Sequence, residues 1–300
     1  MSVLVVGSVA LDTIETPFGK ADYVLGGSAS YFSLSAINFT DVNVVAVIGE
    51  DFPSKHLELF DSKGINIDGL KKEQGNTFRW EGKYGYDLGD PDTLGTYLNV
   101  FETFNPELPD EYRRIDNVFL ANIDPEIQLK VLDQVESPKI VACDTMNFWI
   151  ENKVEKLKEL LKRINILIIN DSEARELSGE PLITNAARKI MNLGPEMLVV
   201  KRGEYGALMF SEEGIFFAPS YLLEKVFDPT GAGDTFAGGF MGYIASNDIN
   251  HISDYKRAVV YGSVLASFTV EDFSINRLAV LKKEEIESRY RAFLKLSNMD

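Results

Sequence analysis

Short, nearly continuous apolar runs recur along the chain. Six of them, rich in Val, Ile and Leu, occupy residues 3–7, 42–49, 117–122, 139–144, 165–170 and 197–203. Strands that are apolar on both faces are typical of a parallel sheet covered by helices. We therefore expect these runs to form one mostly parallel sheet.

Segments with helical periodicity lie between the apolar runs. Apolar positions recur every three or four residues in residues 28–39, 55–64, 126–135 and 154–163. Strands that alternate with helices indicate the βαβ order of a doubly wound fold. The prediction is an α/β fold, with a doubly wound, mostly parallel sheet covered by helices on both faces.

Two stretches interrupt this alternation. Residues 13–27 and 74–104 are rich in Thr, Tyr, Phe and Gly and have no helical period. Such segments favour strands. Because the two stretches are similar in character, we expect them to form one small β lid. The core then comprises residues 1–12, 28–73 and 105–300.

Composition and charge exclude several classes of protein. With 45% hydrophobic and 25% charged residues, the 300-residue chain has the composition of an ordinary globular protein. Its 30 Lys and Arg and 46 Asp and Glu give a net charge of −16, which disfavours nucleic acid or an anionic membrane as a partner. The negative net charge does not exclude a phosphorylated ligand, because backbone amides and a divalent cation can bind phosphate locally.

The cysteine and histidine residues and the N-terminal segment bear on the expected cellular compartment and on possible disulfide or zinc sites. Cys143 is the one cysteine, so no disulfide can form within the chain, and we expect a buried thiol in a reducing compartment. The first residues lack the basic segment of a signal peptide, and no apolar run approaches a bilayer span. We therefore expect a cytoplasmic protein. His56 and His251 are isolated, which disfavours a zinc site.

The strongest chemical signal is KVFDPTGAGDTFAGGFMGYIAS at residues 225–246. A turn at Asp228 leads into Gly231, Ala232 and Gly233, and the following apolar positions have helical spacing. Exposed N–H groups at the start of a helix favour a phosphate ligand. Asp234 lies in the first turn of this helix, where its structural alternative is a capping acid.

Two other phosphate-binding motifs are excluded. Neither Gly19-Lys20 nor Gly82-Lys83 is followed by the Ser or Thr of a Walker A loop. The third position after Gly233 is Phe236, which breaks the dinucleotide fingerprint. A dinucleotide-dependent oxidoreductase is therefore disfavoured.

The segment DPTGAGDTFAGGF resembles the C-terminal signature of the ribokinase-like, or PfkB, carbohydrate kinase family. Further features follow in the order typical of that family. They are GSVALD after the first strand, the Gly26-Gly27 pair, NDSE at 170–173, KRGEYG at 201–206 and YGSVLASFTVE at 261–271. The resemblance therefore covers nearly the whole chain.

The resemblance implies roles in phosphoryl transfer from ATP. Asp234 matches the catalytic base, and the amides of Gly231, Ala232 and Gly233 match the anion hole.

In NDSE, Asn170 and Glu173 match the family's N-x-x-E motif, which helps to hold Mg²⁺ and phosphate. The alternative for Glu173 is a helix-start acid. A monovalent cation is a further candidate ion of the family.

Other matched residues concern the adenine nucleotide. Lys201, Gly203 and Gly206 lie in the strand–turn–strand that receives it. Ser263 and Ser267 lie on the small-residue side of a late helix near the base. The alternatives are a surface lysine at position 201 and close helix packing at the two serines.

The acceptor side is matched by residues far apart in the sequence. Asp12 matches the acid that binds substrate hydroxyls, and Gly26 and Gly27 match the hinge between lid and core. Tyr31 replaces the Asn of common sugar kinases. An aromatic ring that can stack therefore occupies the position where an amide would hydrogen-bond to a hydroxyl of the sugar. The alternative for Tyr31 is helix packing.

Two further acceptor contacts are candidates. Asn147, together with Asp144, lies near the carboxyl end of a strand, where ligands of open α/β sheets bind. Arg79 lies in the lid and is a candidate anion or substrate contact, with an exposed structural arginine as the alternative.

These features predict an ATP- and Mg²⁺-dependent phosphotransferase. We expect the phosphate acceptor to be a hydroxyl group of a sugar or polyol, and a primary hydroxyl is favoured. A nucleoside kinase of the same family is the first alternative, and a non-catalytic ligand sensor is disfavoured by the intact Gly231–Asp234 segment. Pairing of two copies through the lid strands is a candidate assembly.

Overall fold

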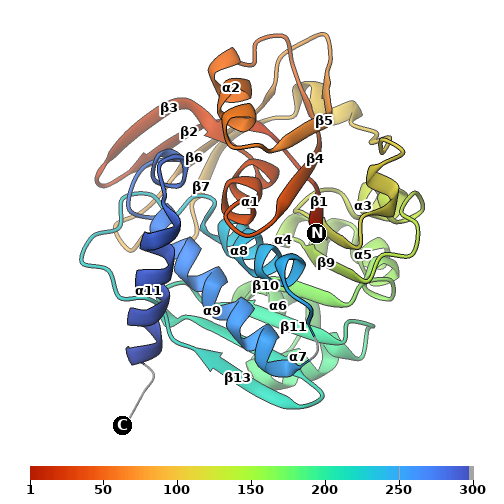
Figure 1. The fold of residues 1–300 in the computed structure, drawn as a ribbon, viewed down its shortest axis with the longest axis vertical. Coiled ribbons are helices and arrows are strands. Elements are labelled where there is room, and N and C mark those ends of the chain that lie inside the picture. Colours follow the sequence, from red (N-terminus) through yellow and green to blue (C-terminus); the bar gives the residue numbers. More distant parts are fainter. Residues whose placement is uncertain (250, 297–300) are drawn as a thin grey trace.

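The structure is a computed structural model and describes residues 1–249 and 251–296. It consists of a nine-stranded sheet with helices on both faces and a separate four-stranded sheet beside it (Figure 1). The strand order of the large sheet is β13-β12-β11-β10-β9-β8-β1-β4-β5. Its strands are β1 Ser2–Val6, β4 Asp41–Ile48, β5 Asn66–Lys72, β8 Asn117–Leu120, β9 Ile140–Asp144, β10 Ile166–Asn170, β11 Met197–Lys201, β12 Ala207–Ser211 and β13 Gly214–Ala218.

The six apolar runs form the centre of this sheet. Strands β1, β4, β8, β9, β10 and β11 pair in parallel, which confirms the predicted α/β architecture. Three further strands complete it: β5 adds in parallel at one edge, and β12 and β13 add antiparallel at the other. The parallel strands all end at one edge of the sheet, where ligands of open α/β sheets bind.

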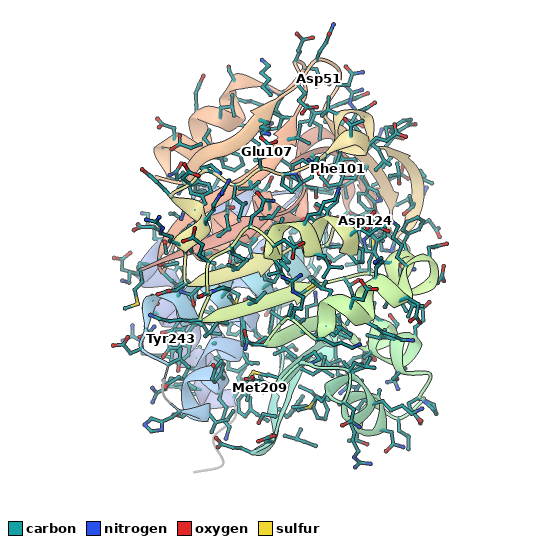
Figure 2. All side chains as sticks on the ribbon, turned by 90° about the vertical axis from the view of Figure 1, so that its right-hand side faces the viewer. Asp51, Phe101, Glu107, Asp124, Met209 and Tyr243 are labelled. Atoms are coloured by element: carbon teal, nitrogen blue, oxygen red, sulfur yellow. The ribbon has the colours of Figure 1, made fainter. Side chains whose placement is uncertain are left out.

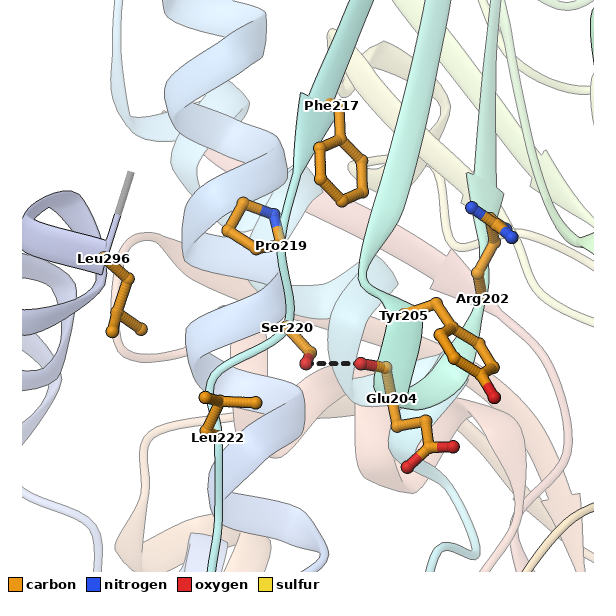
Figure 3. Close-up of a pocket in the computed structure, with 8 residues that line it drawn as sticks. All are labelled: Arg202, Glu204, Tyr205, Phe217, Pro219, Ser220, Leu222 and Leu296. Atoms are coloured by element: carbon orange, nitrogen blue, oxygen red, sulfur yellow. Dashed lines mark hydrogen bonds between the residues drawn. The ribbon is translucent and has the colours of Figure 1, made fainter. Parts of the chain in front are cut away.

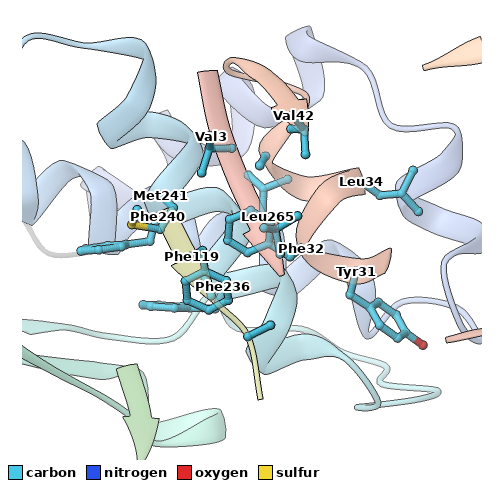
Figure 4. Packing of buried hydrophobic residues seen from close by; sticks show 14 of the residues in the cluster. Val3, Tyr31, Phe32, Leu34, Val42, Phe119, Phe236, Phe240, Met241 and Leu265 are labelled. Atoms are coloured by element: carbon cyan, nitrogen blue, oxygen red, sulfur yellow. The ribbon is translucent and has the colours of Figure 1, made fainter. Parts of the chain in front are cut away.

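The two faces of the sheet bury separate cores. Val3 and Val5 pack with α1, α2, α8, α9 and α11, whereas Leu4 and Val6 pack with α3, α5, α6 and α7. This alternation follows from the two-residue period of a strand. Figure 4 shows the first core, where Phe32 of α1 stacks on Phe119 of β8. The helices are α1 Ser28–Ala36, α2 Ser54–Ser62, α3 Pro125–Leu132, α4 Asn147–Asn152, α5 Val154–Leu161, α6 Asp171–Ser178, α7 Ile183–Met191, α8 Ala232–Ser246, α9 Ile252–Thr269, α10 Asn276–Ala279 and α11 Lys283–Leu296.

The smaller sheet, called the second sheet below, has the order β3-β2-β6-β7. Its strands are β2 Ala10–Thr16, β3 Gly19–Gly26, β6 Phe78–Lys83 and β7 Asp92–Tyr97. Strands β2 and β6, which are far apart in sequence, pair in parallel. The two stretches without helical period therefore supply one sheet.

Two of the three residues considered above for a disulfide or a zinc site, Cys143 and His56, are buried. Cys143 is free and buried in β9, and His56 is buried in α2, where burial lowers its pKa to about 4. Within residues 1–249 and 251–296, no helix has the length and apolar character needed to cross a membrane.

Glycines let α8 approach its neighbours closely. A Cβ at Gly238 would lie 2.3 Å from the carbonyl oxygen of Phe32 in α1, and one at Gly239 would lie 3.0 Å from that of Tyr261 in α9. Helix α8 is thus held between α1 and α9, and its N-terminus is fixed against the sheet.

Figure 2 shows the two ends of the molecule. Asp51, which follows β4, lies toward one end, and Tyr243, near the C-terminal end of α8, lies toward the other.

We predict that Gly238→Ala destabilises the protein. In an open helix this change would raise the free energy of unfolding by about 1 kcal/mol, because alanine is the better helix former. The clash with the α1 backbone should instead lower it by about 1–3 kcal/mol. The sign of the change in chemical denaturation decides, because a stabilised variant would show that α1 and α8 are not in close contact.

Candidate active site

The N-terminus of α8 is shaped by a tight loop. Gly231 precedes the helix with φ of 73°, a left-handed conformation that favours glycine. The Asp228 carboxylate fixes this loop by accepting hydrogen bonds from the N–H groups of Thr230 and Ser274, each at 2.9 Å. The N–H of Ala232 donates to the Pro229 carbonyl at 3.1 Å, so this predicted anion-hole amide is already engaged in the turn.

Lys201 lies directly beside this helix start. Its Nζ is 3.0 Å from Oδ2 of Asp144, and the two side chains are only 17% and 5% exposed. A Cβ at Gly233 would also lie 3.0 Å from this Nζ. The ammonium is therefore held between the end of β9 and the first turn of α8, where it can interact with phosphate.

Three carboxylates surround this single ammonium. Burial raises the pKa of Asp234 to about 7, with Asp144 adding to the shift and Lys201 opposing it. Burial also raises the pKa of Glu173, again with a contribution from Asp144. For Lys201 burial acts to lower the pKa, but Asp144, Glu173 and Asp234 outweigh it, so its pKa is raised. A buried site with more acids than bases favours a bound cation.

Glu173 and Asn170 are brought together at the start of α6. The N–H of Glu173 donates to Oδ1 of Asn170, and the N–H of Asn170 donates to Oε2 of Glu173, both at 2.8 Å. This is a capping box, which satisfies two N–H groups of the helix terminus. Glu173 thus has the helix-start role that the sequence left open, and it also lies close enough to Lys201 and Asp144 to interact electrostatically.

Asp12 projects from the second sheet toward the same site. It is 3% exposed, and its Oδ1 is buried with no hydrogen-bond partner among the described residues. Burial raises its pKa to about 8, and the charges of Asp228 and Asp234 add to this shift. An unpartnered buried carboxylate oxygen is free to accept a hydrogen bond from a ligand hydroxyl.

The glycine pair after β3 lets the backbone pass next to Asp12. A Cβ at Gly26 would lie 1.8 Å from Oδ2 of Asp12, and Gly27 has φ of 90° with its Cβ position 2.5 Å from the Ser8 carbonyl. Neither position can hold a side chain in this arrangement. The pair therefore keeps the Asp12 carboxylate close to the start of α1.

Tyr31 lies beneath the loop rather than on a surface. It is 1% exposed, and a Cβ at Gly231 would lie 2.4 Å from its ring carbons. Its hydroxyl lies near the charges of Asp228 and Asp12, and burial raises its pKa well above the ordinary value. Because the ring is covered, a flat ligand has no open face of Tyr31 on which to stack.

Arg79 does not join this group. Its Nη2 is 2.6 Å from Oδ2 of Asp51, and its guanidinium lies 4.8 Å from the centre of the Tyr23 ring. In the β2–β6 pairing Arg79 is opposite Leu11, the neighbour of Asp12, so its side chain leaves the sheet on the face opposite Asp12. The other acceptor candidate, Asn147, is exposed at the start of α4 and accepts a hydrogen bond from the N–H of Phe148.

The predicted nucleotide residues divide into two groups. Gly203 and Gly206 form the β11–β12 turn, with φ of 53° and 86°. Beside this turn is an open pocket of about 430 Å³ (Figure 3). It is lined by Arg202, Glu204, Tyr205, Phe217, Pro219, Ser220, Leu222 and Leu296.

The two serines of α9 have partners elsewhere. Ser263 donates its hydroxyl to the Val259 carbonyl at 3.1 Å, and Ser267 donates to the Val264 carbonyl at 2.6 Å and accepts from Arg289. Neither lines the pocket of Figure 3.

Sequence reasoning did not assign roles to several residues that complete the site. The Thr230 hydroxyl donates to Oη of Tyr84 at 3.0 Å, which ties the end of β6 to the helix-start loop. Asp144 and Asp228 fix Lys201 and this loop. The sequence had placed Asp144 near a ligand-binding strand end and Asp228 in the turn, without predicting these contacts, and nothing in the sequence links Tyr84 to Thr230.

The acidic residues suit a magnesium ion held mainly by substrate. Among the described residues, no three His, Cys, Asp or Glu side chains form a ready-made metal cage. Mg²⁺ commonly uses one or two carboxylates together with phosphate oxygens and water. Glu173, beside Asp144 and across from the helix start, fits that pattern.

Solved structures of other proteins share this fold. A crystal structure of Methanocaldococcus jannaschii nucleoside kinase has a TM-score of 0.78 at 21% identity, covering 97% of this chain and 98% of that one. A crystal structure of a putative Ribokinase II from E. coli, in complex with ATP and Mg²⁺, has a TM-score of 0.79 at 17% identity, covering 97% of this chain and 99% of that one. These similarities establish a shared fold.

Sequence comparison identifies the family to which the chain belongs. A cytidine kinase of Thermococcus kodakarensis is 31% identical over 248 residues, covering 80% of this chain and 87% of that protein. A nucleoside kinase of Methanocaldococcus jannaschii is 27% identical over 265 residues, covering 86% and 82%. The profile of the family described as pfkB family carbohydrate kinase matches residues 3–278. The chain therefore belongs to the pfkB family of carbohydrate kinases.

Proposed function

We propose that this kinase transfers the γ-phosphate of ATP, with Mg²⁺, to a hydroxyl group of a nucleoside. The observation that carries the proposal is the convergence of Asp234, Lys201 and the α8 N-terminus at one buried position. It supplies a proton acceptor, a cation and a helix N-terminus where a phosphoryl group would be transferred.

The relatives favour a nucleoside over a free sugar. The sequence analysis preferred a sugar or polyol and kept a nucleoside as the alternative. The two relatives with 31% and 27% identity are named a cytidine kinase and a nucleoside kinase, and both similarities extend over most of each chain. These names support the alternative, so we take a nucleoside as the acceptor.

The chain's own residues account for the chemical step. Asp12 accepts a hydrogen bond from a hydroxyl of the acceptor and orients it. The attacking hydroxyl oxygen forms a bond to the γ-phosphorus, the bond from that phosphorus to the β,γ-bridging oxygen breaks, and ADP leaves. Asp234 takes the hydroxyl proton, and its pKa of about 7 places it closer to an effective base than an ordinary aspartate.

Charge on the transferred group is stabilised from the other side. Lys201 and the N-terminus of α8 lie next to each other and both favour an anion. Mg²⁺ would be held through Glu173 and the ATP phosphates, and it would supply further charge neutralisation. The adenosine end of ATP would extend past Arg202, which follows Lys201, into the pocket of Figure 3.

A panel of acceptors tests the proposal. Purified protein is incubated with ATP, Mg²⁺ and one of cytidine, inosine, adenosine, ribose, fructose or inositol, and ADP release is measured. We expect kcat/KM to be at least tenfold higher for one nucleoside than for any free sugar or inositol. Preference for a sugar or inositol would contradict the nucleoside assignment and leave the kinase assignment intact.

Asp234→Asn is the matched control for this panel. It keeps the size of the side chain but cannot take the proton, so kcat should fall roughly 10²- to 10⁴-fold while ATP binding is retained. Removing a buried charge should also raise the melting temperature at pH 8, because burial disfavours the ionised carboxylate. Turnover equal to that of the wild type would remove Asp234 from the mechanism.

Glu173→Gln separates the metal role of this residue from its cap. Glutamine can preserve the capping box with Asn170, so the helix start should stay intact, and loss of the buried charge should raise the melting temperature at pH 8, as in Asp234→Asn. Loss of the charge should raise the Mg²⁺ concentration needed for half-maximal activity several-fold, with a smaller effect on the acceptor KM. An unchanged Mg²⁺ titration would leave Glu173 with the capping role alone.

A further inference from the structure

Trp80 lies on the face of the second sheet that carries Asp12. In the parallel pairing of β2 and β6, Asp12 is opposite Trp80 and Ile14 is opposite Gly82, with no register shift between them. Residues opposite each other in a ladder point to the same face, about 4.8 Å apart. Tyr84 continues this ladder and contacts Thr230 of the helix-start loop. The face that carries Trp80 is thus the one turned toward the phosphoryl-transfer site.

The indole ring lies flat along the sheet. A Cβ at Gly82 would meet the six-membered part of the Trp80 ring at 2.0–2.6 Å, so this ring sits directly over the Gly82 backbone. Nε1 of Trp80 donates to Oγ1 of Thr93 on β7 at 3.3 Å, which sets the orientation of the ring. Glycine within a strand often marks a position that an aromatic side chain covers.

The other side of the ring remains available. Trp80 is only partly buried, and Thr93 and Thr96 beside it on β7 are exposed. Among the described residues, no other aromatic ring or cation stacks on it. Asp12, on the neighbouring strand, has an unpartnered carboxylate oxygen for a hydroxyl.

We infer that Trp80 is the platform on which the base of the acceptor nucleoside stacks. Gly82, which has no side chain, lets the Trp80 ring lie flat on the sheet. The inference rests on the proposed function. A nucleoside has a flat base joined to a hydroxyl-bearing sugar, and Trp80 and Asp12 offer a flat ring beside a hydroxyl acceptor. Tyr31, which the sequence favoured for stacking, is covered by Gly231 and cannot serve.

The opposite face of the same sheet provides a matched control. A Cβ at Gly95 would meet the Tyr97 ring at 2.9–3.2 Å, which is the same arrangement of glycine and ring. Glu81 is opposite Gly95, and Arg79 is opposite Tyr97, so this second ring lies on the face that does not carry Asp12. A change at Gly95 therefore also pushes a ring off the same sheet, from a longer distance, but leaves the proposed platform in place.

The test uses the nucleoside that the wild type phosphorylates best. Trp80→Ala should raise its KM about tenfold or more, since stacking on an aromatic side chain contributes that order of affinity. Gly82→Ala should raise KM in the same direction by displacing the ring, Trp80→Phe should restore most of the affinity, and Gly95→Ala should leave KM within twofold.

Fluorescence gives a reading independent of turnover. The chain has two tryptophans, so Trp149→Phe leaves Trp80 as the only indole. Nucleoside added without ATP should quench this protein's emission with saturation, and ribose at equal concentration should not.

The outcomes separate the inference from the function on which it rests. Nucleoside turnover by the wild type, with unchanged KM in Trp80→Ala and Gly82→Ala and no quenching, would overturn the Trp80 platform and leave the nucleoside kinase standing. Absence of both nucleoside turnover and quenching in the wild type and Trp149→Phe proteins would overturn both. If Trp80→Ala melts below the assay temperature, the KM of Gly82→Ala and the quenching decide.

Discussion

The arrangement of Lys201 among Asp144, Glu173 and Asp234 is the constraint on which the site depends. One ammonium faces three acids, contributed by the end of β9, the start of α6 and the start of α8. They meet because parallel strands β9, β10 and β11 end at the same edge of the sheet. Removing the lysine would leave several buried negative charges without a partner, which is far more costly than losing an exposed ion pair.

The second sheet completes the site from the other side, and glycines set how closely it approaches. Gly26 leaves room for Asp12, Gly231 for the Tyr31 ring, and Gly82 for Trp80. In each case an added Cβ would meet a neighbouring side chain at less than 3 Å. The link between Tyr84 and Thr230 then joins this sheet to the loop before α8. Short contacts thus join the second sheet, where we propose that the acceptor binds, to the loop before α8.

Much of the fold could be predicted from the sequence because its signals are local. The strands of the sheet centre are buried on both faces, so each appears as an uninterrupted apolar run. Strand β5 has no such run, since it lies at an edge and carries Lys71 and Lys72 next to solvent, and it was not predicted. The helix start at Asp234 was predicted because glycines and an acid stand together there.

Other features of the site depend on distant contacts that no local pattern encodes. Which face of the second sheet a residue occupies follows from the register between β2 and β6, which are more than 60 residues apart. Arg79 and Trp80 are neighbours in sequence, yet one pairs with Asp51 and the other lies beside Asp12. Tyr31 was expected to face a ligand, but the loop at Gly231 covers it.

The ionisation of Asp234 in the ligand-free protein tests the central claim most directly. NMR titration of aspartate carboxyl carbons, assigned by comparison with Asp234→Asn, follows this group alone. The account predicts that Asp234 titrates near pH 7, and that Lys201→Met moves its pKa higher because the opposing ammonium is lost. A value near the ordinary 3.8, or one that Lys201→Met leaves unchanged, would contradict it.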